Sequence, residues 1–78
     1  MNKQEFIELF VEELEIEDMV VTEDTRFEEI EEWNSMGHMI AIALVSDNFN
    51  VKVTGNELKE LSTIKSLIEK IGLDKFTE

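Results

Sequence analysis

Ser35 and His38 are the residues of this chain whose types and spacing could support chemistry. A serine and a histidine three positions apart lie one turn from each other on the same side of a helix. A catalytic Ser–His pair also requires a placed acid, an oxyanion hole and enough fold around it to form a pocket. The sequence offers no motif for a placed acid or an oxyanion hole, and the chain is short for a fold that forms a pocket. A catalytic pair is therefore disfavoured.

Ser35 follows an acid-rich, turn-like stretch and precedes an apolar run, so a helix is expected to begin there. The local pattern favours an N-cap, in which the Ser35 hydroxyl accepts a hydrogen bond from a backbone N–H of the first turn. The alternative is a modification site, because a serine at such a corner is exposed to the active site of another protein. His38 is expected to be a surface or packing residue, with contact to a phosphate on Ser35 as the alternative.

Acidic residues are dense in the first half of the chain, which raises the question of whether the chain binds calcium. An EF-hand loop needs alternating oxygen ligands, a central glycine and a closing glutamate, and residues 16–34 contain no glycine. The chain also has no cysteine, so it has no thiolate metal site and no disulfide. We therefore predict no defined metal site.

The composition indicates one small domain spanning residues 1–78. The chain contains no proline and three glycines, which favours helices. It begins without a basic segment followed by an apolar run, and no apolar stretch approaches the roughly 20 residues that span a bilayer. We expect a soluble, cytoplasmic monomer.

The charge is divided unevenly between the two halves. Residues 1–34 hold thirteen acidic residues against Lys3 and Arg26, a net charge of −11, whereas residues 35–78 carry a net charge of −1. The electrostatic field of this negative charge repels nucleic acid and anionic membranes and steers basic protein surfaces toward the acidic half. A solvated acidic surface that aids solubility is the alternative explanation.

The apolar spacing predicts an amphipathic helix over residues 3–15, opened by a capping box of Asn2 and Glu5. Residues 16–34 form a long connection, in which Thr25 to Glu32 could add a short helical turn. Isolated apolar side chains should anchor this loop on the helices, and they are Ile16, Met19, Val20, Val21, Phe27, Ile30 and Trp33. For Trp33, contact with a partner is the alternative.

A second helix is predicted over residues 35–49, and its apolar residues surround much of the cylinder. Its expected core stripe consists of Met39, Ile42, Val45 and Phe49, with Ala41 beside it, whereas Met36 is expected to be half-exposed and Ile40 to face outward. Two shorter helices follow, opened by Thr54 with Glu57 and by Ser62 or Thr63, and Gly72 ends the last. The segment Val51–Val53 is too short for a sheet and should place a valine in the core. The predicted fold is all-α, a small four-helix bundle with a long first loop and a short third helix.

The order of several short segments resembles that of the acyl carrier proteins, in their small standalone form. The segment Asp24–Phe27 is similar to the family's Asp-Thr-x-Phe/Leu loop element, and Asn34–Met36 to its Asp-Ser-Leu modification motif. Phe49 matches the aromatic residue that closes the second helix, and residues 53–58 and 61–64 match the third-helix and Thr-Val segments. The resemblance covers about residues 3–72 and is carried by the joint order of these segments.

The resemblance implies a carrier and not an enzyme. The serine that matches Ser35 would bear 4′-phosphopantetheine, which a phosphopantetheinyl transferase takes from coenzyme A, making the chain a phosphoprotein. The thiol of the arm would hold an acyl or aminoacyl group for loading and transferring enzymes of fatty-acid or specialised metabolite biosynthesis. An unmodified helical interaction domain with the same fold is the competing hypothesis.

The chain departs from the family pattern at two places. Asn34 replaces the aspartate before the serine, and the second helix has Gly37, Ile40 and Ser46 where fatty-acid carriers place acids. These differences point to a dedicated carrier, loading an amino acid, hydroxy acid or short acyl group, with docking through Met36, Ile40 and Ala43. The complete set of predicted partner contacts is Glu31, Glu32, Asn34, Met36, His38, Ile40 and Ala43.

Overall fold

The computed structural model describes residues 1–77, which form four α-helices and two short 3₁₀ helices. Their bounds are α1 Lys3–Leu14, η1 Phe27–Glu29, α2 Ser35–Phe49, α3 Gly55–Lys59, α4 Ile64–Ile71 and η2 Leu73–Lys75. Within these residues there is no strand, only an isolated antiparallel bridge between Arg26 and Thr63. The predicted all-α, four-helix fold with a long first loop and a short third helix is confirmed.

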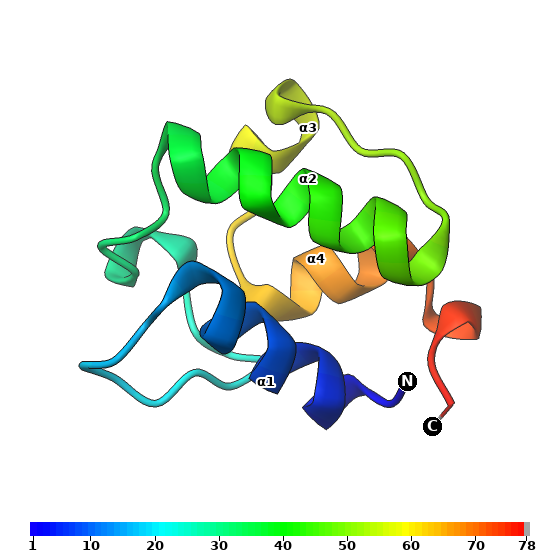
Figure 1. The fold of residues 1–78 in the computed structure, drawn as a ribbon, viewed down its shortest axis with the longest axis horizontal. Helices are drawn as coiled ribbons and strands as arrows, with labels where there is room; N and C mark the ends of the chain where they lie inside the picture. The colour runs from blue at the N-terminus through cyan, green and yellow to red at the C-terminus, as the bar shows by residue number, and fades with distance from the viewer. Residues whose placement is uncertain (78) are drawn as a thin grey trace.

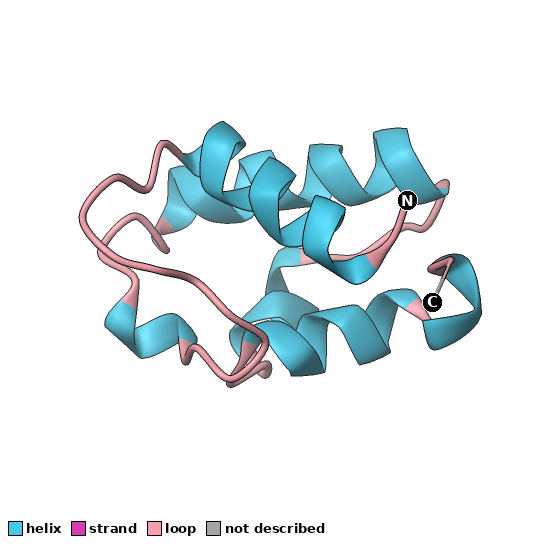
Figure 2. Ribbon diagram, turned by 90° about the horizontal axis from the view of Figure 1, so that it is seen from below, coloured by secondary structure: helices cyan, strands magenta, loops and turns pink. Residues whose placement is uncertain are grey.

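The four helices surround one interior, with α2 lying across α1 and α4 in Figure 1 and the short α3 beyond α2. The loop between α1 and α2 closes one end of the molecule, and both chain termini lie at the other end (Figures 1 and 2). The Thr77 N–H donates to the Met1 carbonyl over 3.1 Å, which joins the two termini. The start of α2 is therefore at the loop end of the bundle, away from the termini.

Local capping fixes most of the helix ends. The capping boxes of Asn2 with Glu5 and of Thr54 with Glu57 are present as predicted. Of the two candidates for opening α4, Thr63 is the cap, and its hydroxyl accepts a hydrogen bond from Ser66. Gly72 follows α4 with φ of +116°, a conformation that side chains other than glycine rarely adopt. These helix ends could be predicted from the sequence, because the residues that signal each end lie within four positions of one another.

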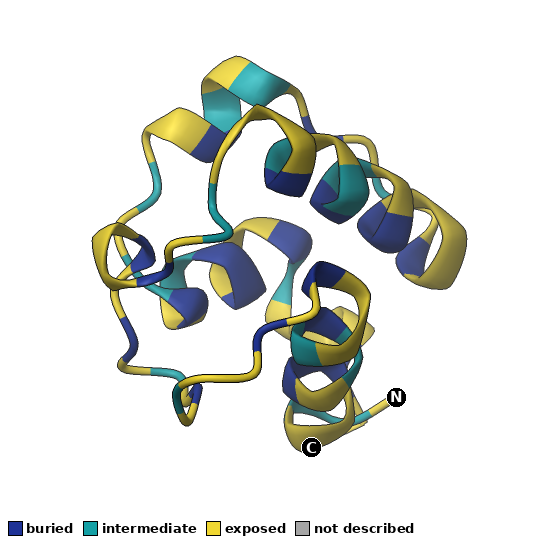
Figure 3. Cartoon of the chain, turned by 60° about the vertical axis from the view of Figure 1, so that its left-hand side comes forward, coloured by how far each residue is buried: buried dark blue, intermediate teal, exposed yellow. Residues whose placement is uncertain are grey.

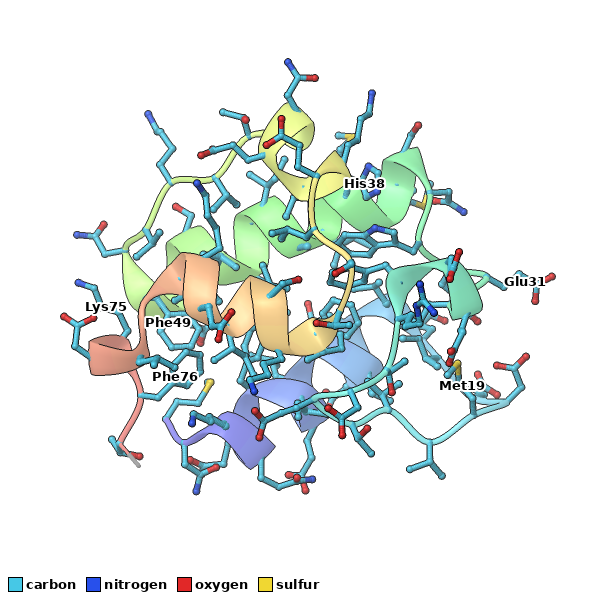
Figure 4. The ribbon with its side chains drawn as sticks, turned by 180° about the vertical axis from the view of Figure 1, so that it is seen from behind. Met19, Glu31, His38, Phe49, Lys75 and Phe76 are labelled. Carbon is cyan, nitrogen blue, oxygen red and sulfur yellow. The ribbon has the colours of Figure 1, made fainter. Side chains whose placement is uncertain are left out.

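Aromatic side chains dominate the interior, where the buried residues of α1, α2 and α4 face one another (Figure 3). The fully buried ring of Phe6 lies edge-on to Phe49 at 5.6 Å and to Phe76 at 5.7 Å between ring centroids. Figure 4 shows Phe76 beside Phe49, 4.9 Å away. The sequence analysis did not assign Phe76 a role, and it is buried because η2 returns the chain to the end of α2.

The connection from α1 to α2 is held by buried anchors and by backbone hydrogen bonds. The Phe27 N–H donates to the Ser62 carbonyl at 2.9 Å, and the Ile64 N–H donates to the Thr25 carbonyl at 3.0 Å. The predicted anchors Ile16, Val21, Phe27 and Ile30 are buried, and Met19 and Trp33 are half-buried. The prediction for Val20 was wrong, since 84% of it is exposed. Adjacent residues of an extended segment point to opposite sides, so Val21 alone could face the core.

The rotation of α2 about its axis differs from the prediction. The buried residues are Gly37, Ala41, Leu44, Val45 and Phe49. Met39 was expected in the core but is 70% exposed, and Ile40, expected to face outward, is half-buried against α1. Ile42 is half-buried. An almost uniformly apolar helix carries too little periodic contrast for the sequence to fix this rotation.

Helices α3 and α4 are joined by an ion pair between Lys70 Nζ and Glu57 Oε2 at 2.6 Å. The hydrogen bond from Lys70, with one from the Thr54 backbone, lowers the pKa of the Glu57 carboxyl below its ordinary value. Of the two valines expected to reach the core between α2 and α3, Val53 is buried and Val51 is half-buried. No helix within residues 1–77 has the length and apolar character needed to cross a membrane.

Candidate functional site

Ser35 is the first residue of α2 and is exposed at the corner between the loop and the helix. It is not the N-cap, which corrects the prediction from the local pattern. Asn34 holds that position, and its Oδ1 accepts hydrogen bonds from the N–H groups of Met36 at 3.1 Å and Gly37 at 3.2 Å. The Ser35 hydroxyl therefore takes no part in capping and is available at the surface.

Gly37 determines how closely the first turn of α2 approaches the loop. A Cβ atom at this position would lie 2.3 Å from the backbone carbonyl oxygen of Glu32. That separation is far inside van der Waals contact, and the obstacle is backbone that cannot rotate away. Glycine is thus needed for the loop to pass this close to the first turn of α2.

An aromatic cluster lies beneath the corner. The ring of Trp33 stacks on Phe27 with centroids 4.2 Å apart and an interplanar angle of 13°. His38 packs edge-on against Trp33 at 4.6 Å. The Nε2 atom of His38 is buried without a hydrogen-bond partner among the described residues, so it does not activate Ser35. Trp33 anchors the loop as predicted, and His38 is a packing residue in this structure.

The outward side of α2 beyond Ser35 is apolar. Met36 and Met39 are 71% and 70% exposed, and Ala43, one turn further, is also exposed. We call Met36, Met39 and Ala43 the methionine face. Sequence reasoning missed Met39 because it assigned that residue to the core; its spacing of four residues from Ser35 was the available signal.

The other side of Ser35 borders a groove between α1 and α2. One hollow of about 150 Å³ is lined by residues that include Glu13, Glu32, Met36 and Ile40. A second hollow of about 310 Å³ continues along α2 and shares Glu13 and Ile40 with the first. We call these two hollows together the α1–α2 groove. Sequence reasoning did not identify Glu13, because only the packing of α1 on α2 brings it here.

The predicted contact residues thus divide among three surroundings. Met36 and Ala43 belong to the methionine face and also line the groove, Ile40 and Glu32 line the groove alone, and His38 packs below the corner. Asn34 caps α2 and also lines the first hollow. Glu31 is exposed and points away from the bundle (Figure 4). The predicted docking residues Met36, Ile40 and Ala43 all border the α1–α2 groove, and their role in docking stays a prediction.

The corner presents a primary hydroxyl at the N-terminus of a fifteen-residue helix. The free N–H groups and the dipole of such an end favour an anion. Residues 1–77 contain no group of three or more histidine, aspartate or glutamate side chains arranged to hold a metal ion. The arrangement can accept an anionic group on Ser35 from another protein.

A comparison with protein-family models matches residues 4–71 to the family described as phosphopantetheine attachment site. The match includes the loop, Ser35, the methionine face and the α1–α2 groove. Comparisons with curated proteins and with solved structures gave no match.

Proposed function

The chain belongs to the phosphopantetheine attachment site family, which is defined by covalent attachment of 4′-phosphopantetheine, and from this premise we propose that Ser35 receives the arm. The thiol of the arm, when present, holds a substrate as a thioester. The chain would then be a carrier that presents this substrate to partner enzymes. Tethering of this kind raises the local concentration of the substrate at each docked enzyme.

The single observation that carries the assignment is the geometry of Ser35. It is exposed, it begins α2, and the capping function belongs to its neighbour Asn34. A phosphate on its hydroxyl would lie at the positive end of the helix dipole, an interaction of about 0.3–1 kcal/mol. The residues at this corner therefore fit the group without a change in the helix cap.

We further propose that the partners are enzymes of a specialised pathway, loading an amino acid, a hydroxy acid or a short acyl group. Helix α2 has Gly37, Ile40 and Ser46 where charge-steered carriers present acids, the methionine face beside them is apolar, and Asp47 is the acidic residue of α2. Apolar contact depends little on salt, whereas charge-steered docking weakens as the Debye length shrinks. The acidic first half, with Glu31 and Glu32, would speed the encounter with a basic transferase.

A second function is supported by the methionine face itself. Two methionines exposed by about 70% side by side suit a partner that binds the face directly, with no arm on Ser35. In that case the chain is an unmodified interaction domain. We include in the proposal that residues 1–78 act as one carrier unit, as a monomer and in the cytoplasm.

The deciding experiment is intact-mass analysis after incubation with coenzyme A and a broad-specificity phosphopantetheinyl transferase. Wild type should gain one phosphopantetheine group, and Ser35→Ala should gain none. Ser46→Ala is the matched control, because Ser46 is also exposed on α2, and it should be modified like wild type. A wild-type protein that gains no mass supports the unmodified interaction domain, and a modified Ser35→Ala protein shows that another residue is the attachment site.

A further inference from the structure

The methionine face holds sulfur atoms at the surface beside the proposed attachment site. Met36 follows Ser35 directly and Met39 lies one turn further along α2, with exposed fractions of 71% and 70%. The other two methionines are more covered, since Met1 is 37% exposed and Met19 is half-buried against the core. The chain has no cysteine, so these four thioethers are its only sulfur atoms. Exposed, oxidisable sulfur is therefore concentrated at the start of α2.

A thioether that is open to solvent reacts with hydrogen peroxide. The sulfur attacks one peroxide oxygen, so that an S–O bond forms and the O–O bond breaks. The hydroxide that leaves takes the proton from the new S–OH group, and the sulfur is thereby oxidised by two electrons while the peroxide is reduced to water. The product, methionine sulfoxide, is polar, and methionine sulfoxide reductases convert it back. In that return step a dithiol is oxidised to a disulfide and the oxygen leaves as water.

Oxidation of the methionine face would affect docking far more than folding. Met36 and Met39 contribute nothing to the buried core, so a sulfoxide oxygen on either would stay in water in the free protein. The cap of α2 would also survive, because Asn34 accepts its hydrogen bond from the backbone N–H of Met36. In a docked complex the same oxygens would move from water into an apolar contact, where a polar group without a hydrogen-bond partner is unfavourable. The free protein thus tolerates a change that the complex does not.

We propose that Met36 and Met39 form a redox-sensitive modification site, at which oxidation by hydrogen peroxide reversibly weakens docking of the transferase on Ser35. The effect on docking rests on the proposed function, whereas the preferred oxidation of these two residues depends only on their exposure. The other largely exposed apolar residues, Val20 and Leu73, contain no sulfur, so the oxidant leaves them unaltered. The modification therefore changes the polarity of the methionine face beside the attachment site.

The test oxidises the chain before the arm is added, because the thiol of the arm would react with the same oxidant. The protein is treated with hydrogen peroxide, catalase removes the excess, and transferase and coenzyme A follow. Peptide mapping by mass spectrometry should find oxygen on Met36 and Met39 before Met19. The kcat/KM for loading should fall at least about fivefold, the smallest factor expected for burying an unpartnered polar group. Sulfoxide reductases with dithiothreitol should restore it, and the melting temperature should stay near that of untreated protein.

Two variants, each compared with its own untreated sample, separate the methionine face from other oxidised residues. Met36→Leu/Met39→Leu keeps the face apolar but removes its sulfur, so treated and untreated samples should load at the same rate. Met19→Leu is the matched control, a change of similar volume elsewhere, and should lose as much on treatment as wild type does.

Normal loading of oxidised wild type, or an equal loss in Met36→Leu/Met39→Leu, overturns the inference alone. Oxidation of Met19 ahead of Met36 and Met39 also overturns it, whether or not the chain is loaded. Untreated wild type that gains no phosphopantetheine group overturns the proposed function, and the effect of oxidation on loading with it.

Discussion

Helices α2 and α4 use apolar residues in different ways. In α4 the buried residues are Ile64, Leu67, Ile68 and Ile71, and the exposed ones are the charged Lys65, Glu69 and Lys70. Helix α2 also buries one side, yet it exposes the methionine face on the other. Helix α4 therefore carries only the apolar surface that folding requires, whereas α2 carries more. In the proposed function, this excess on α2 is the surface that contacts a partner.

The largest effect should come from the buried side of α4. Leu67→Ala removes a side chain with no exposed surface and should lower the free energy of unfolding by about 2–5 kcal/mol. Met39→Ala on the outward side of α2 should change it by less than about 0.5 kcal/mol. Urea unfolding followed by circular dichroism measures both. Similar losses for the two variants would mean that Met39 contributes to the core and that the contrast between the helices does not hold.

Docking on the transferase, unlike the free energy of unfolding, should be sensitive to changes on the exposed side of α2. Met39→Glu places a charge in the methionine face and should lower kcat/KM for loading by the transferase about tenfold, or about 1.4 kcal/mol. The fold should be retained, since 70% of Met39 is exposed. Ile40→Glu is a poorer test, because Ile40 is half-buried against α1 and the change also perturbs packing.

The control for Met39→Glu is Ser46→Glu, which adds the same charge to an exposed residue of α2 beyond the methionine face. It should load at nearly the wild-type rate. A salt series with Glu31→Gln/Glu32→Gln then measures the contribution of charge. Normal loading of Met39→Glu together with impaired loading of this double variant would show that docking is electrostatic.

The start of α2 offers a third comparison, between two adjacent residues. Asn34→Ala removes the cap and should cost about 0.5–2 kcal/mol, whereas Ser35→Ala should cost less than about 0.5 kcal/mol. Asn34→Asp keeps a capping oxygen and adds a charge at the positive end of the dipole, so it should be at least as stable as wild type. Thermal melts rank the three variants. A larger loss for Ser35→Ala than for Asn34→Ala would restore Ser35 as the cap.

The smallest effect concerns the polar side of the α3–α4 pair. The lowered pKa of Glu57 means that its pairing with Lys70 stabilises the fold above the ordinary glutamate pKa and is lost as pH falls through the lowered value. Glu57→Gln keeps a capping-box side chain but removes the charge. The melting temperature of wild type should exceed that of the variant slightly at neutral pH, and the two should converge as the pH falls below the lowered pKa of Glu57. A difference that persists unchanged at low pH would exclude the ion pair as its cause.

The sequence by itself determined most of the helix ends. Asn2 with Glu5 and Thr54 with Glu57 cap their helices through contacts three residues apart, and Gly72 ends α4 through its own backbone freedom. The predicted span of α2, residues 35–49, coincides with the structure. The sequence also pointed to Ser35 as the residue to test. Such features depend on neighbours along the chain, so no knowledge of the fold was needed.

Only the tertiary structure decided which sides of these elements face inward and which residues meet across them. The sequence could not fix the rotation of α2, because a helix that is apolar nearly all round has no dominant period; its inward side is defined by the packing of Ala41, Leu44, Val45 and Phe49 in the core. The α1–α2 groove and the burial of Phe76 likewise arise from residues more than twenty positions apart. Such contacts depend on how whole elements pack, which no local pattern encodes.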